Sequence, residues 1–128
     1  MEIGYALEKV GVGMSILARH PGRIRERLLA AFTEQILFAP TEGKGIPDEV
    51  GRRLQAVKDQ ASRIPGVGNE GALAATFAVI DENEAEEIVG ELEWIYYSLQ
   101  SAREHPEEYG ALGHARPELS RHRVASSR

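Results

Sequence analysis

Apolar residues recur along this chain at steps of three and four, the period of a helix that buries one face. The clearest stripe runs through Ile3, Leu7, Val10, Met14 and Leu17. No stretch alternates long enough to predict a strand. The pattern therefore predicts an all-α fold of five helices: about 2–19, Ile24 to before Pro40, Pro47 to Ile64, a short helix through Leu73, Phe77 and Ile80, and about 82–105.

Breaking residues separate these stripes. His20-Pro21-Gly22 ends the first helix, and Pro65 and Pro106 end later ones. Asp81 has the position of an N-cap, and Glu84, three residues later, completes the pattern of a capping box. The short connections predict a single compact bundle over residues 1–105, followed by a polar, extended or partly disordered tail over 106–128.

Composition limits the class of protein. The 128 residues are 42% hydrophobic and 27% charged, as expected for one globular domain. The absence of cysteine excludes disulfides, thiolate metal sites and a cysteine nucleophile. The acidic start lacks the basic residues of a signal peptide, and no apolar run approaches the roughly 20 residues of a membrane helix. We expect a cytoplasmic protein that does not enter the membrane.

Charge is distributed unevenly around a net value of −5. Residues 65–99 carry eight acids and no base, whereas residues 19–64 carry nine bases and six acids. Two such regions attract each other within a monomer or across a dimer. The acidic total argues against nucleic acid as a partner, because its binding requires neutralisation of phosphates.

A group of arginines surrounds the start of the second predicted helix. Arg23 and Arg27 share a face, and cations at a helix N-terminus oppose the helix dipole. The pattern predicts a compensating acidic partner, with the acidic helix at 82–93 as the candidate, within the chain or across an interface. Arg23 and Arg27 are therefore possible electrostatic anchors of an interface, and an RNA or phosphate ligand is the alternative.

The segment from Gly66 to Gly71 matches G-x-G-x-x-G. In a dinucleotide site these glycines follow a strand and open a helix. Here a predicted helix and Pro65 precede them, and Glu70 would place a negative charge beside a phosphate. We interpret the segment as a turn between helices, with anion or nucleotide binding as an alternative, and we expect no cofactor.

Metal and nucleophile signatures are also weak. His105 and His114 lie near Glu104, Glu107 and Glu108, but neither H-x-x-x-H nor E-x-x-H occurs. The serines do not form a G-x-S-x-G elbow. The sequence therefore predicts no metal site and assigns no catalytic residue.

Arg116 and His122 stand six positions apart in the segment Arg-Pro-Glu-Leu-Ser-Arg-His. This spacing resembles the Arg…His pair of the HEPN ribonucleases, which are also α-helical bundles. The resemblance implies an RNA-cleaving enzyme that uses Arg116 and His122. In that family the pair lies on a core helix, whereas here Pro117 follows the arginine. A helical-bundle ribonuclease is the alternative function.

Two predicted helices carry apolar residues opposite their main stripes. At 100° per residue, Trp94 lies opposite Leu92 and Leu99, in a row with Gly90 and Tyr97. The first helix carries a second row of Tyr5, Val12 and Ile16. Aromatic residues on an exposed face anchor interfaces. The sequence thus predicts a non-enzymatic protein that works by association, as a homodimer or with another protein.

Overall fold

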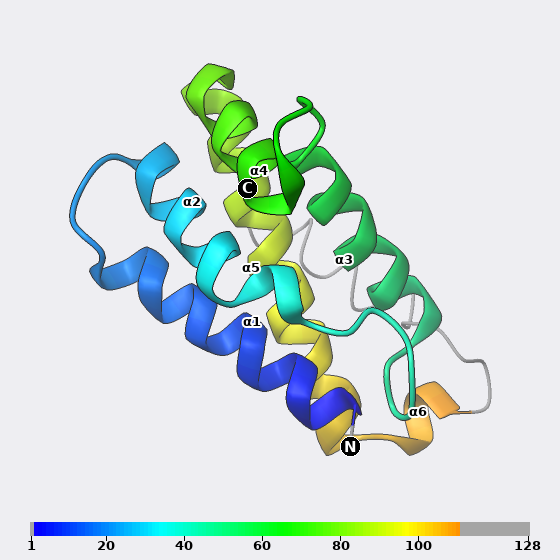
Figure 1. The fold of residues 1–128 in the computed structure, drawn as a ribbon. Helices are drawn as coiled ribbons and strands as arrows, with labels where there is room; N and C mark the ends of the chain where they lie inside the picture. Colours follow the sequence, from blue (N-terminus) through cyan, green and yellow to red (C-terminus); the bar gives the residue numbers. More distant parts are fainter. Residues whose placement is uncertain (1, 111–128) are drawn as a thin grey trace.

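All five predicted helices are present in the computed structural model, which describes residues 2–110 (Figure 1). The described residues contain no strand, so the all-α prediction is confirmed. The elements are α1 (Glu2–Arg19), α2 (Ile24–Glu34), the 3-10 turn η1 (Ile36–Phe38), α3 (Asp48–Ala61), α4 (Gly68–Val79), α5 (Glu82–Glu104) and the short α6 (Glu107–Gly110).

The longest helix, α5, is the centre of the bundle. It packs against α1, α2 and α3, and in Figure 1 it lies behind and between them. Helix α4 closes one end by packing on α2 and α3, with the rings of Phe32 and Phe77 5.6 Å apart. Because α5 has neighbours on several sides, its buried residues cover about half of its circumference: Ala85, Ile88, Leu92, Trp94, Ile95, Ser98, Leu99 and Ala102.

The second predicted helix is interrupted. Helix α2 ends at Glu34, Gln35 leaves the helical conformation, and η1 follows, where the sequence predicted one helix up to Pro40. The break coincides with a tertiary contact that periodicity does not reveal. Ile36 turns inward against Gly13 of α1, so closely that a Cβ on Gly13 would lie 2.6 Å from its Cγ1 atom.

The loop between η1 and α3 ties the start of α1 to the bundle. The Ile3 N–H donates to the Lys44 carbonyl at 3.2 Å. Gly43 and Gly45 have φ values of +128° and +88°, in the left-handed region that favours glycine. Lys58 of α3 donates to the Ala39 carbonyl, and burial lowers the pKa of this lysine. The loop therefore links the start of α1 to α3.

The C-terminal end differs in part from the prediction. Residues Glu107–Gly110, expected to belong to an extended tail, form the turn α6. The remaining tail, 111–128, lies outside the described residues, and the division between domain and tail stays a prediction. Within 2–110, no helix combines the length and apolar character that crossing a membrane requires.

Candidate association surface

Trp94, the first anchor predicted from the sequence, is buried and not exposed. Only 4% of its surface is accessible, because α3 packs on the side of α5 that periodicity assigned to solvent. The Arg53 guanidinium of α3 covers the indole, with 3.6 Å between its carbon and the ring centroid. The expectation of an exposed Trp94 was therefore wrong: this side chain belongs to the core.

Arg53 is itself fixed by a carboxylate of α5. Its Nε and Nη2 atoms donate to Glu91 at 2.6 and 2.8 Å, a bidentate pair. The hydrogen bond with Glu91 raises the pKa of Arg53 above its ordinary value, so the guanidinium is charged at every relevant pH. Trp94, Arg53 and Glu91 thus form a stack that joins α3 to α5.

Gly90 and Tyr97 do lie on the outer face of α5. Gly90 is exposed, and a Cβ built there meets nothing within 4 Å. Tyr97 is 48% exposed. However, the exposed residues of the same strip include Glu86 and Glu93. Because Trp94 is buried, this face of α5 carries acidic side chains and one aromatic residue, Tyr97. It is not the apolar row that the sequence suggested.

The second predicted row, on α1, is at the surface as expected. Tyr5 is 47% and Val12 41% exposed, and Ile16 is partly buried at the edge of the core. Lys9 lies between them in the row and places its ammonium 5.3 Å from the Tyr5 ring centroid. This face of α1 combines large apolar side chains with one positive charge.

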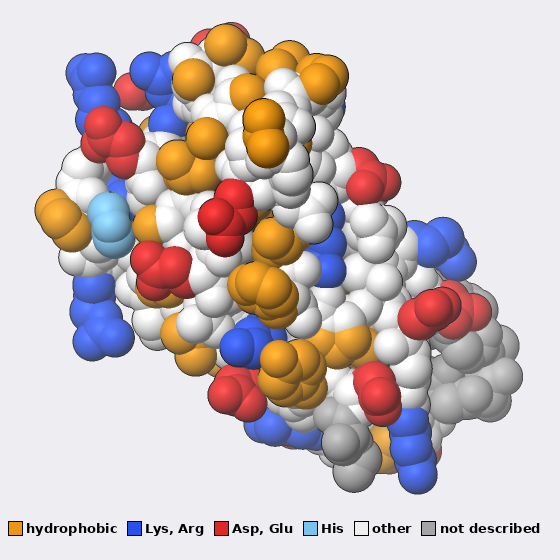
Figure 2. Space-filling view, viewed as in Figure 1, with side chains coloured by type: hydrophobic (Ala, Val, Ile, Leu, Met, Phe, Trp, Pro, Cys, Tyr) orange, Lys and Arg blue, Asp and Glu red, His pale blue; other side chains and the backbone are white. Residues whose placement is uncertain are grey.

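Figure 2 shows hydrophobic side chains running down the visible side of the molecule, from α4 over the region of α2 and η1 to α1. Phe38 of η1 is 52% exposed and was not singled out from the sequence. An open cavity of about 220 Å³ between α2 and α4, lined by Leu29, Ala74 and Phe77 among others, was also missed. Its lining comes from two helices, so only the packing reveals it.

The arginines near the start of α2 do not pair with the acidic helix. Arg27 donates to the Leu17 carbonyl at 2.9 Å, at the C-terminal end of α1. Arg25 donates to the Ala78 and Ile80 carbonyls at 3.2 and 3.1 Å, at the end of α4. They satisfy carbonyls that a helix end leaves without partners. Within the chain, Arg27 therefore binds a carbonyl and not the acidic helix, and an acidic partner across an interface stays a prediction. Arg23 is exposed, and its backbone N–H donates to Glu26.

Two acids of α5 pair instead with α3 and with Arg63, which lies just beyond the end of α3. Glu84 accepts hydrogen bonds from Arg63 and from Gln60, and Glu91 accepts from Arg53. These partners confirm the predicted attraction between the basic and acidic regions, within one chain. Glu84 also shows why the capping box is incomplete: its N–H binds the Asp81 carboxylate at 2.8 Å, but its own carboxylate turns to α3.

The glycine-rich motif opens a helix but does not follow a strand. Helix α3 ends at Ala61, and α4 begins at Gly68 inside the motif. A Cβ on Gly66 would lie 2.4 Å from the carbonyl carbon of Gly71. Gly66 is therefore needed because the turn packs against itself, in keeping with the interpretation as a turn.

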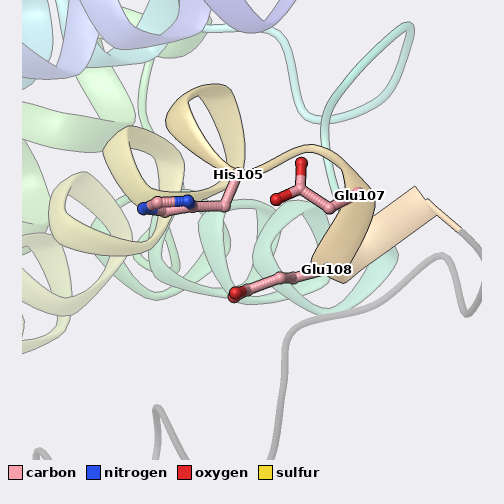
Figure 3. A group of neighbouring side chains, drawn as sticks. All are labelled: His105, Glu107 and Glu108. Carbon is pink, nitrogen blue, oxygen red and sulfur yellow. The ribbon is translucent and has the colours of Figure 1, made fainter.

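His105, Glu107 and Glu108 form the one group in the described residues with the donor set of a metal site (Figure 3). Their ligand atoms lie within 4.8 Å of one another. All three are exposed, and exposed acids gather in this way without an ion, so the group carries no assignment. His114, Arg116 and His122 lie outside the described residues, and the ribonuclease hypothesis stays a prediction.

Comparisons with family models, with curated proteins and with solved structures find no match to this chain.

Proposed function

We propose that this protein works by associating with another protein chain through the outer face of α1. The proposal is supported by one observation above the others: Tyr5 and Val12 keep more than 40% of their surface exposed on a helix whose opposite face is core. Large apolar side chains in such a row cost hydration free energy unless a partner covers them. We further propose a cytoplasmic location, which suits a cysteine-free chain.

The outer face of α5 is the weaker candidate. The exposed carboxylates of Glu86 and Glu93 flank Gly90, and a partner there would have to desolvate them. On α1 the central charge is Lys9, whose long aliphatic stem can cover apolar surface while its ammonium stays in water. Association through α1 therefore requires less desolvation of charged groups than association through α5. We do not propose nucleic acid as the partner.

The size of the native complex tests this proposal. In extracts of native cells, we expect the wild-type protein to elute from gel filtration ahead of a monomer. The Val12→Glu variant should elute as a monomer because a charge enters the apolar row. Gln55→Glu, an exposed change on α3, is the matched control and should behave as wild type. A monomeric wild type, or a complex that survives Val12→Glu, would contradict the proposal.

A further inference from the structure

The surface row of α1 includes charged residues as well as the three apolar residues Tyr5, Val12 and Ile16. Six positions follow one another at alternating steps of three and four, the spacing of the a and d positions of a coiled coil. All six are exposed or partly exposed: Glu2, Tyr5, Lys9, Val12, Ile16 and Arg19. They extend over the whole of α1, which begins at Glu2 and ends at Arg19.

This row is complementary to itself when read backwards. If a second α1 lies antiparallel and the two-fold axis passes between residues 10 and 11, each row position meets another row position. Tyr5 then faces the partner's Ile16, and Lys9 faces the partner's Val12. Glu2 faces the partner's Arg19, so each end of the pair brings together opposite charges.

The charges also select the direction. In a parallel pair, Glu2 would meet the partner's Glu2 and Arg19 the partner's Arg19, and like charges at such short range repel. The two helix dipoles also oppose each other only in the antiparallel arrangement. Lys9 fits this arrangement because its ammonium is drawn toward the Tyr5 ring, away from the two-fold axis and from the partner's Lys9.

We infer that α1 pairs with α1 of a second copy of this chain, antiparallel and centred between residues 10 and 11. The inference rests on the proposed function and names its partner. A pair of 18-residue helices about 27 Å long offers less contact than a standard protein interface. The dimer is therefore expected to dissociate in the micromolar range.

Disulfide trapping tests the register of the helix pair. Because the chain contains no cysteine, only the introduced cysteines can form disulfides. We would prepare Tyr5→Cys and Ile16→Cys proteins and oxidise each alone and as a mixture. In the antiparallel pair the two copies of residue 5 stand about 16 Å apart, beyond the reach of a disulfide. The mixture should therefore form the covalent 5–16 dimer about tenfold faster than either protein alone. Gln55→Cys mixed with Glu87→Cys is the control for random collisions.

A dominant 5–5 dimer would overturn the antiparallel arrangement, and mixed dimers that form no faster than the control would overturn pairing between copies. Charge reversal gives a second readout that does not depend on cysteines. Sedimentation velocity should show weaker dimers for Glu2→Arg and for Arg19→Glu, and recovery in the double variant. Equal dissociation constants for all of them would contradict the register.

These outcomes are separable from failure of the proposed function. If the purified protein stays monomeric while the native complex is still lost in Val12→Glu, α1 binds a different protein and only the second copy is excluded. If the native complex is also unchanged by Val12→Glu, the protein does not associate through the outer face of α1.

Discussion

Arg53 contacts three groups that no single sequence pattern connects. Its guanidinium covers Trp94, binds Glu91 in a bidentate pair and lies 4.0 Å from Glu49. Stacking on an indole and a bidentate carboxylate bond both require the planar, delocalised charge of arginine. The residue thus protects the largest side chain of α5 from water.

Replacing this arginine should therefore destabilise the fold and expose the indole. Arg53→Ala is expected to lower the free energy of unfolding by about 1–2 kcal/mol, because a cation–π contact and a half-buried ion pair are lost together. Trp94 is the only tryptophan, so its emission should shift to longer wavelength in the folded variant. Urea titration followed by fluorescence measures both effects.

Arg52→Ala is the matched control, since Arg52 is the exposed neighbour on the same helix. An Arg53→Ala protein as stable as Arg52→Ala, with unchanged emission, would show that the stack contributes nothing.

Glu84 gives stability a pH dependence. Hydrogen bonds from Arg63 and Gln60 hold the pKa of its carboxyl below the ordinary value. A carboxyl with a lowered folded-state pKa stabilises the fold above its unfolded pKa of about 4.3, and this contribution disappears as the pH falls through the folded value. Glu84→Gln should thus cost less than about 1 kcal/mol at pH 7 and nothing in acid.

Thermal unfolding of Glu84→Gln and wild type from pH 7 to pH 3 measures this difference. Glu87→Gln, exposed on the same helix, should show no such convergence. A difference between Glu84→Gln and wild type that does not shrink between pH 7 and pH 3 would mean that the carboxylate charge is not responsible.

At the scale of elements, periodicity and breaking residues predicted most of the fold. The start of α1, the end of α5 near Pro106 and the N-cap at Asp81 are all where the sequence placed them. The break at Gln35 was not predicted, and the sequence pattern also does not show that Ile36 lies against Gly13 of α1. The prediction that Trp94 is exposed was wrong for a similar reason. The helical angle gives the direction of a side chain around α5, but it does not tell which element packs on that side.

Two helical glycines should respond oppositely to the same change. A Cβ at Gly90 meets nothing, so Gly90→Ala should stabilise the fold by about 0.5–1 kcal/mol, the helix propensity that glycine lacks. A Cβ at Gly13 would overlap Ile36, so Gly13→Ala should destabilise it by about 1 kcal/mol or more. Melting temperatures of the two variants measure the contrast, and a gain for Gly13→Ala would contradict the packing of η1 on α1.

For the whole molecule, the uneven charge along the sequence joins α5 to α3 and to the segment that follows α3, inside one chain. Glu84 and Glu91 meet their bases within the monomer, so the charge pattern does not by itself call for a partner. The sequence predicted correctly that Tyr5 and Val12 lie at the surface, because α2, η1 and α5 pack on the opposite face of α1. It could not tell which of two helices keeps an exposed row, since that depends on where α3 packs.

The most direct test of the account compares α1 with α5 in one experiment. A photoreactive amino acid would be placed at position 12 or at position 90, both exposed and both able to hold a larger side chain. After irradiation in native cells, position 12 should give a discrete cross-linked species that is lost when Tyr5→Ser is added, and position 90 should not. Cross-links from position 90 alone, or from neither position, would contradict association through α1.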